Sequence, residues 1–400
     1  MELKQLVQSV ENEVIELRRH LHQNPEVSGE EYETSKTIQQ KLSEAGISYK
    51  TGYAKTGILG IIKGDKPGGT VALRADIDAL PIQEENDIPY KSTIQNKMHA
   101  CGHDAHTAML IGTGKVLNQL KSELVGTILL VFQPAEENAP IGGSQQMMDD
   151  GVFDEFIPDV IFGQHVWPDL PVGEVGVLHN EIMGASDRFK IRVKGSGGHA
   201  SMPHQSNDAI IIANNLITQL QTIVSRNTDP IDSAVLTIGK IVGGYRYNVI
   251  ADEVTLEGTI RTFKPEVKEM VKNRFYSIVD GIGKSFDAQM TIDYLDGYPA
   301  TVNTPEWADE VRNAARKILG ENATPAVSPS LGGEDFSRFL KKYPGAFYWL
   351  GTSVEDAEPQ YPLHDPRFKL NEKALTKGVD VMVQLTLDTL QKLKKEESSQ

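Results

Sequence analysis

Apolar and polar positions follow a helical period near the N-terminus of this chain and a strand-like pattern soon afterwards. The first segment mixes apolar and charged residues at helical spacing, which predicts an amphipathic helix and not a signal peptide. A second helix is expected over about residues 30–45. Apolar runs at 57–62 and 70–75 then predict two strands, and a turn is expected between them at 66–69, where proline and glycines cluster.

Further apolar runs predict strands that are buried in a sheet. Residues 127–132 are almost entirely apolar, which is typical of a parallel strand covered on both faces. The runs at 159–163 and 346–350 also predict strands. Because helical segments lie between these strands, the outer parts of the chain predict an α/β fold.

The middle of the chain changes its pattern and predicts a separate domain. From Arg188 to Lys194 apolar and charged residues alternate, which indicates a strand with one face in water. The expected order from there is strand, helix, two strands, helix and strand, the split βαβ arrangement of ferredoxin-like domains. We therefore expect a domain at 185–296 that is inserted into a discontinuous catalytic domain at 1–184 and 297–400. The elements after the first strand are expected at about 208–226, 234–241, 253–263, 265–284 and 288–295.

One short stretch, residues 98–106, concentrates the side chains that bind transition metals. It holds the only cysteine, Cys101, among three of the ten histidines. If its first half is extended, His99, Cys101 and His103 project to one side, and Asp104 could cap the helix that follows. No second pair of ligands completes a zinc finger. A buried cysteine can also be an inert small hydrophobe, so that alternative stays open.

Acidic residues and another histidine follow the predicted strands. Asp76 and Asp78 come directly after one strand, where a simple turn or helix cap is as good an explanation. Glu136 and Glu137 follow the next strand; one could hold a metal while the other addresses water, or both could lie in a solvated loop. His165 is expected just past a third strand. Because these groups recur at strand ends, we expect a site at the carboxyl edge of an α/β sheet.

Composition excludes several classes of function. The 400 residues are enough for two or three domains, and the net charge of −15 argues against binding to nucleic acid or to an anionic membrane surface. No apolar run approaches the length of a membrane span. A single cysteine cannot form an internal disulfide, which fits a reducing cytoplasm. We therefore expect a soluble, acidic protein of a size typical of enzymes, located in the cytoplasm.

Five motifs together resemble the aminoacylase/carboxypeptidase superfamily of dinuclear metallopeptidases, in particular the amidohydrolase branch with the hippurate hydrolases and the plant auxin-conjugate hydrolases. The resemblance runs over almost the whole chain. It implies a mixed-sheet catalytic domain with an inserted ferredoxin-like domain that serves as lid and dimerisation module. The motifs occupy residues 74–81, 99–106, 133–137, 163–165 and 363–365.

The resemblance also implies roles for individual residues. Two divalent metal ions, zinc or manganese, are expected, with Cys101 as the bridging ligand. Glu136 would be the general base, and Asp76 would orient a ligand. Arg74 stands where the wider superfamily has a histidine. His99 and His106 match the motif without being ligands. The implied ligands are Cys101, His103, Glu137, His165 and His364.

In the inserted domain, the resemblance implies a histidine that serves the partner subunit. His199 is expected to reach the active site of the other subunit of a homodimer and to steady the oxyanion. Asn248, Arg261 and Gly333 match substrate-contacting positions, although Arg261 could also be a solvated strand arginine.

The implied reaction is metal-dependent hydrolysis of N-acyl amino acids, with acetyl- or benzoyl-type acyl groups. A dipeptidase or carboxypeptidase acting on short peptides is the alternative within the same chemistry. A metal-dependent binding protein and a metal-stabilised structural protein are alternatives of other classes. Glu136 argues against a pure binding protein, because binding alone needs no base beside a ligand.

Overall fold

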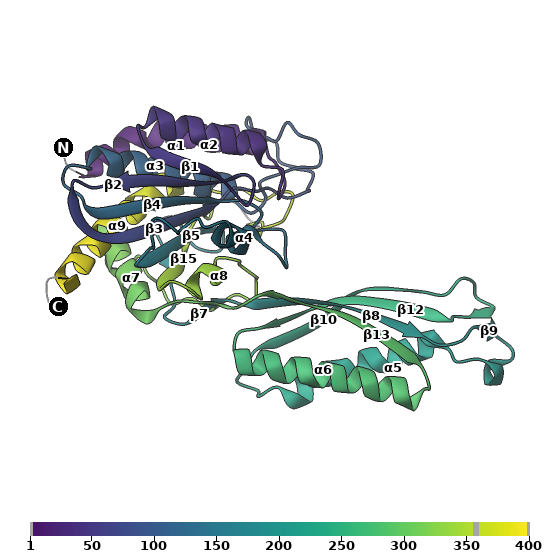
Figure 1. The fold of residues 1–400 in the computed structure, drawn as a ribbon. Helices are drawn as coiled ribbons and strands as arrows, with labels where there is room; N and C mark the ends of the chain where they lie inside the picture. The colour runs from purple at the N-terminus through teal and green to yellow at the C-terminus, as the bar shows by residue number, and fades with distance from the viewer. Residues whose placement is uncertain (1–2, 355–359, 398–400) are drawn as a thin grey trace. The chain divides into compact units, whose positions relative to one another are not determined.

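The computed structural model describes residues 3–354 and 360–397, and the chain divides into two compact units (Figure 1). Unit 1 comprises Met1–Ile182, Thr301–Pro329 and Asp335–Gln400, and unit 2 comprises Met183–Ala300 and Ser330–Glu334. The sequence analysis placed residues 330–334 in the catalytic domain. In the structure they belong to unit 2, where the Gly184 amide donates to the Gly332 carbonyl oxygen at 2.9 Å.

Unit 1 contains a mixed sheet in which the strands occur in the order β1-β2-β4-β3-β5-β15-β6. Strands β3, β4, β5 and β15 run parallel to their neighbours within this group, whereas β1, β2 and β6 pair antiparallel. The mixed α/β fold is as predicted. The strands are β1 (Ser48–Tyr53), β2 (Gly57–Lys63), β3 (Lys66–Asp76), β4 (Val125–Gln133), β5 (Val160–Trp167), β6 (Val175–Gly176) and β15 (Gly345–Gly351).

Two strand boundaries differ from the sequence prediction. The expected turn at 66–69 is the first part of β3, where the pairing with β4 shifts register between Lys66 and Thr70. Such an irregularity accommodates the proline and glycines without ending the strand. The short strand β1 was missed, because its alternation is polar on both faces and leaves no buried apolar run.

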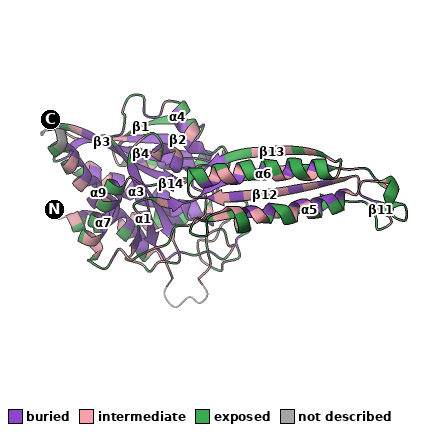
Figure 2. Cartoon of the chain, turned by 90° about the horizontal axis from the view of Figure 1, so that it is seen from below, coloured by how far each residue is buried: buried purple, intermediate pink, exposed green. Residues whose placement is uncertain are grey.

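The helices of unit 1 cover this sheet and bury one core. Helix α3 is buried nearly all round, as expected for a helix enclosed by other elements, and it packs against α1, α9 and β3. Figure 2 shows the buried residues concentrated in the strands and in α3. No helix among the described residues is long and apolar enough to cross a membrane. The helices are α1 (Leu3–Gln23), α2 (Tyr32–Glu44), α3 (His103–Gln119), α4 (Gly143–Asp149), α7 (Pro305–Leu319), α8 (Ser337–Leu340) and α9 (Lys373–Glu397).

Unit 2 is an antiparallel sheet with the strand order β10-β12-β8-β13, covered on one face by α5 and α6 (Figure 1). This order and the βαββαβ succession are those of the ferredoxin-like arrangement expected from the sequence. The first helix is α-helical to Thr222 and continues as a π-helix over Ile223–Asn227, so the helical segment ends close to the predicted position. The elements are β8 (Ala185–Lys194), α5 (Ala209–Thr222), β10 (Ala234–Gly243), β12 (Glu253–Thr262), α6 (Pro265–Ser285) and β13 (Gln289–Tyr298).

Candidate metal centre

The predicted metal-binding stretch is a turn that leads into α3, and not an extended strand. Gly102 has a left-handed backbone with φ 83°, and α3 begins at the next residue, His103. A Cβ atom at Gly102 would lie 2.4 Å from Val166 Cγ2, so only glycine fits between this turn and β5. The turn still brings the cysteine and the histidine together, although by a different geometry from the alternation that the sequence suggested.

Asp104 does not cap α3. The helix has no side-chain cap, and the Asp104 carboxylate instead lies 2.9 Å from Arg18 Nε on α1. Nothing near Asp104 in the sequence indicates this contact, because Arg18 lies 86 positions earlier in the chain. Asp104 therefore belongs to the packing of α3 against α1.

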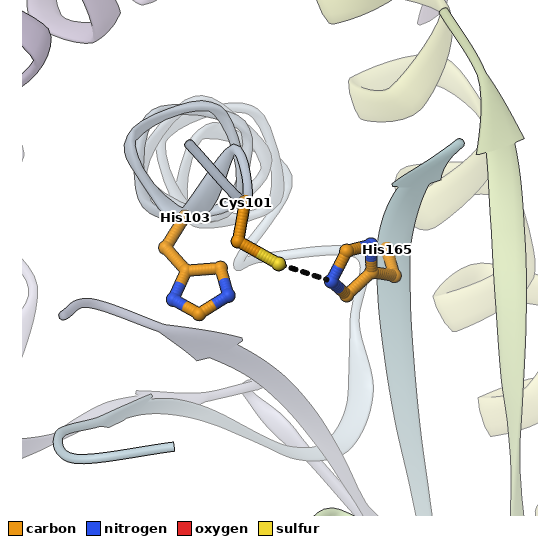
Figure 3. Close-up of side chains that lie close together, drawn as sticks. All are labelled: Cys101, His103 and His165. Atoms are coloured by element: carbon orange, nitrogen blue, oxygen red, sulfur yellow. Dashed lines mark hydrogen bonds between the residues drawn. The ribbon is translucent and has the colours of Figure 1, made fainter. Parts of the chain in front are cut away.

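Three of the predicted metal-binding side chains converge at the start of α3. Ligand atoms of Cys101, His103 and His165 lie within 4.8 Å of one another, and Cys101 Sγ is 3.5 Å from His165 Nε2 (Figure 3). His165 lies inside β5 and not just past it as predicted. Its Nδ1–H donates to the Val166 carbonyl oxygen at 2.7 Å, so Nε2 keeps a lone pair for a metal.

Cys101 also belongs to a second group, with Glu137 and His364. His364 Nε2 lies 3.0 Å from Glu137 Oε1. His364 has a left-handed backbone with φ 69°, and its amide donates to the Ala100 carbonyl oxygen at 2.9 Å. Strained backbone at a non-glycine residue is typical of functional sites. The five side chains proposed as ligands thus form two overlapping groups that share Cys101.

Asp78 was missed as a supporting residue, although the sequence analysis noted it. Its Oδ1 accepts a hydrogen bond from His103 Nδ1 at 3.2 Å, and its Oδ2 accepts one from the Glu137 amide at 3.0 Å. The contact to His103 leaves Nε2 of that ring for a metal and resembles the usual carboxylate–histidine support of metal ligands. In the sequence, an aspartate directly after a predicted strand is explained equally well by a simple turn, so this supporting role could not be recognised there.

Asp76 and His106 form the layer behind these groups. Asp76 Oδ1 accepts from His106 Nδ1 at 2.5 Å, and His106 Nε2 accepts from the Val166 amide at 2.9 Å. Both nitrogens of His106 are therefore used, as expected for a residue that supports a site without binding the metal. His99 is buried, and neither of its ring nitrogens has a hydrogen-bond partner in the described part of the chain. Burial lowers the pKa of His99 to about 4 and keeps the ring neutral.

Arg74 is fully enclosed beneath these carboxylates. Its guanidinium lies 2.7 Å from Asp76 Oδ2 and 3.0 Å from Asp335 Oδ1, and its Nε donates to Gln133 Oε1 at 2.8 Å. A planar guanidinium can hold two carboxylates in fixed orientations. Arg74 thus offsets part of the negative charge behind the centre, that of Asp76 and Asp335.

The electrostatics of the centre favour a bound cation. Burial disfavours protonation of His103, but the Asp76 and Asp78 carboxylates outweigh it and raise the His103 pKa to about 10. Burial would also raise the pKa of both aspartates, yet Arg74 and His103 keep the Asp76 pKa well below its usual range, and His103 keeps that of Asp78 low. The pocket therefore attracts positive charge.

Glu136 lies beside this centre with its carboxylate buried. Its Oε1 is 3.4 Å from the Asp335 amide nitrogen, and it forms a metal-capable group with His103 and Glu137. The preceding residue, Ala135, has φ 57° in the left-handed region. The two adjacent glutamates nevertheless both place a carboxylate oxygen within 4.8 Å of a ring nitrogen of His103.

Unit 2 carries the other predicted residues. His199, on β9 (Gly198–His199), pairs with Val249 on β11 (Val249–Ile250) and lines an open pocket with Asn248. The Ser201 amide donates to His199 Nδ1 at 3.1 Å, so the neutral ring carries its proton on Nε2. That nitrogen is a hydrogen-bond donor.

The Arg261 guanidinium makes no hydrogen bond or ion pair with the side chains or backbone of the described residues, although its backbone pairs with β8 and β10. It is half-buried on β12, and burial lowers its pKa although Asp187 opposes this. Gly333 leaves room for it, because a Cβ atom there would lie 3.1 Å from Arg261 Nη1. A half-buried guanidinium without a carboxylate partner is suited to an anionic ligand.

The donor set fits divalent metals. A thiolate, imidazole nitrogens whose other nitrogen is hydrogen-bonded, and carboxylates meet within ligand range, and the surrounding acids attract positive charge. Such sets suit zinc and related first-row ions.

Comparison with known proteins agrees with this chemistry. Residues 72–388 match the model of peptidase family M20/M25/M40. The chain is 43% identical over 370 residues to N-acetyl-L-cysteine deacetylase of Bacillus subtilis, covering 92% of this chain and 86% of the relative. It is 41% identical over 379 residues to thermostable carboxypeptidase 2 of Saccharolobus solfataricus, covering 94% and 95%.

A solved structure supports the same assignment. The Bacillus subtilis protein described as a dinuclear metal-binding peptidase from the M20 family superposes with a TM-score of 0.82 at 37% identity, covering 96% of this chain and 99% of that one. The chain is a metal-dependent hydrolase of amide bonds, and it belongs to peptidase family M20/M25/M40.

Proposed function

We propose that the chain hydrolyses the amide bond of N-acyl amino acids at a centre of two divalent metal ions. The observation that carries this proposal is the pair of overlapping donor groups that share Cys101 beside the buried carboxylate of Glu136. The relative named as an N-acetyl-L-cysteine deacetylase supports the substrate class. The proposed ligands are Cys101, His103, Glu137, His165 and His364.

Bound divalent ions supply Lewis acidity, which lowers the pKa of water and polarises the amide carbonyl. Glu136 takes the proton of the attacking water and delivers it to the leaving nitrogen, a role typically worth roughly 10²–10⁴-fold. Asp78 holds His103 in orientation through Nδ1, which leaves Nε2 facing the metal centre. The ions are zinc or manganese: the thiolate favours zinc, and the carboxylates also suit manganese.

Unit 2 carries the residues that we propose to contact the substrate. His199 donates from Nε2 to the developing oxyanion, since its Nδ1 is already occupied by the Ser201 amide. Arg261 binds the carboxylate of the substrate, with Gly333 leaving the space and Asn248 contributing a polar contact from the pocket of His199.

We further propose that unit 2 forms a homodimer and that His199 serves the site of the partner subunit. Strand β10 lies at a sheet edge, and within the described chain it pairs only with β12. Apolar side chains are exposed along it and on the neighbouring α5, which is typical of an interface. These exposed residues are Val235, Ile241, Val242, Ile210 and Ile211.

We place the protein in the cytoplasm, because a reducing compartment preserves the free thiol of its only cysteine.

The shared site has a direct test. His199→Ala and Glu136→Gln subunits should each be inactive alone, and mixing them should restore activity in hybrid dimers that hold one intact site. No recovery after subunit exchange, verified by the formation of hybrid dimers, would contradict the trans arrangement.

Carboxypeptidase activity is the second candidate, favoured by the relative that carries this name. Metal analysis of the purified protein, combined with a panel of N-acetyl amino acids, hippurate and dipeptides, separates the two. Higher kcat/KM for the N-acyl amino acids is expected. A clear preference for peptides would reject the proposed substrate class while leaving the metal centre in place.

A further inference from the structure

Glu31, directly before α2, is a fully buried carboxylate for which neither the metal centre nor the core gives a reason. Its Oε1 accepts hydrogen bonds from the Gly29 amide at 2.8 Å and from the Ala135 amide at 3.0 Å, and its Oε2 accepts one from Thr56 Oγ1 at 2.9 Å. No basic side chain in the described part of the chain pairs with it. Burial and the charge of Asp78 raise the Glu31 pKa.

Burying a carboxylate without a cation costs free energy, so we asked which part of the structure this carboxylate holds in place. Two of its three donors are backbone amides, and one of them belongs to Ala135. That residue has φ 57°, a conformation that disfavours any residue with a Cβ atom. Ala135 immediately precedes Glu136. The bond from Glu31 therefore holds the strained residue from which the proposed base projects.

We propose that Glu31 is a positioning residue that fixes the turn at Ala135 and thereby aims the Glu136 carboxylate. The inference rests on the proposed function, in which Glu136 is the general base. Glu31 belongs to none of the groups that could hold a metal, so it acts through the backbone and not as a ligand. From the other side, the Asp335 amide approaches Glu136 Oε1 at 3.4 Å.

The primary test is Glu31→Asp, which keeps the charge but shortens the side chain by one methylene. With N-acetyl amino acids, kcat should fall on the order of 10²-fold, because misplacing a catalytic group by about 1 Å has effects of that size. KM and metal content should stay close to those of the unchanged protein. Glu31→Gln should retain most of the activity, since its amide oxygen can accept the same two backbone hydrogen bonds.

Ala135→Gly supplies the rescue. Glycine adopts a left-handed φ without steric cost, so the Glu31→Asp/Ala135→Gly double variant should recover kcat by about tenfold over Glu31→Asp. Glu84→Asp is the matched control, because Glu84 is another buried carboxylate that accepts a backbone hydrogen bond, from Ser92 at 2.7 Å, away from this turn. It should leave kcat nearly unchanged and gain nothing from Ala135→Gly.

A second measurement follows the turn itself. Hydrogen exchange in a peptide covering residues 133–137 should be faster in Glu31→Asp than in Glu84→Asp, whatever the substrate. Should Glu31→Asp fail to fold, Ala135→Val strains the same turn and should lower kcat with metal retained.

Unchanged kcat in both Glu31→Asp and Ala135→Val, absence of rescue by glycine, or unchanged exchange would overturn the inference. An unchanged protein that is inactive towards every N-acyl amino acid would instead contradict the proposed function, and the exchange experiment would still decide the role of Glu31.

Discussion

His103 and Asp104 are consecutive residues at the start of α3, yet they belong to two buried clusters of different character. Around Asp104, the charges balance one another in what we call the closed network, which consists of Arg18, His22, Glu84 and Asp104. Asp104 Oδ2 lies 2.9 Å from Arg18 Nε and 2.7 Å from His22 Nδ1, and His22 Nε2 lies 3.3 Å from Glu84 Oε1.

The metal centre on the His103 side is not balanced in this way. Its acids raise the His103 pKa to about 10, and the Cys101 thiol and His165 Nε2 face the same space, 3.5 Å from one another. Residue type therefore does not separate a structural cluster from a metal site. What separates them is whether distant segments bring enough positive charge to neutralise the carboxylates.

The largest effect should come from Glu136→Gln, which removes the proposed base while keeping its shape. We expect kcat to fall roughly 10²–10⁴-fold. Metal content, measured by elemental analysis, should match that of the unchanged protein, because the substitution alters none of the proposed ligands. Full activity in this variant would remove Glu136 from the mechanism.

Arg18→Met breaks the balance of the closed network. It leaves the buried Asp104 carboxylate without its guanidinium partner and with His22 as its remaining cation, so the free energy of unfolding should drop by about 3–5 kcal/mol, measured by chemical denaturation. Adding Asp104→Asn should recover part of this loss. A change below about 1 kcal/mol would show that the pair is not a major stabilising contact.

Metal removal tests the opposite property of the metal centre. Chelation should abolish activity, and reloading with zinc or manganese should restore it. The free energy of unfolding should also fall by about 3 kcal/mol when the metal had been present at some 100 times its Kd. Arg18→Met should show the same chelator-induced decrease as the unchanged protein, because the closed network needs no metal; a smaller decrease in that variant would mean that the two clusters are coupled.

The smallest effect is the pH dependence of the closed network. Burial and Arg18 disfavour protonation of His22, but Asp104 and Glu84 outweigh them and raise its pKa. Its stabilising contribution is therefore fully present below the unfolded value of about 6.5 and is lost as the pH rises through the raised folded pKa. The difference in unfolding free energy between the unchanged protein and His22→Gln should shrink over that range. A constant difference would mean that His22 stays neutral.

The helices, the strands and the metal-binding side chains could be predicted from the sequence, because all of them are local properties of the chain. Apolar periodicity located most helices and strands, and the unusual density of metal-binding side chains drew attention to residues 98–106. It misplaced the backbone of that stretch, because the left-handed turn at Gly102 is imposed by contact with Val166 on β5. It also placed His165 beyond a strand that extends to Trp167.

The supporting residues required the tertiary structure. Asp78 joins His103 to the Glu137 backbone, and Glu31 reaches Ala135 more than a hundred positions along the chain. Nothing near Glu31 in the sequence indicates that partner.

The amino-acid sequence was enough to identify the chemical groups of this protein, because these are given by side-chain type. It was also enough to place most helices and strands, because these depend on neighbours within a few residues. The tertiary structure alone decided which carboxylates meet Arg18 and Arg74 and which surround His103. Long-range packing sets those distances, and electrostatic energies in a buried site depend on them steeply.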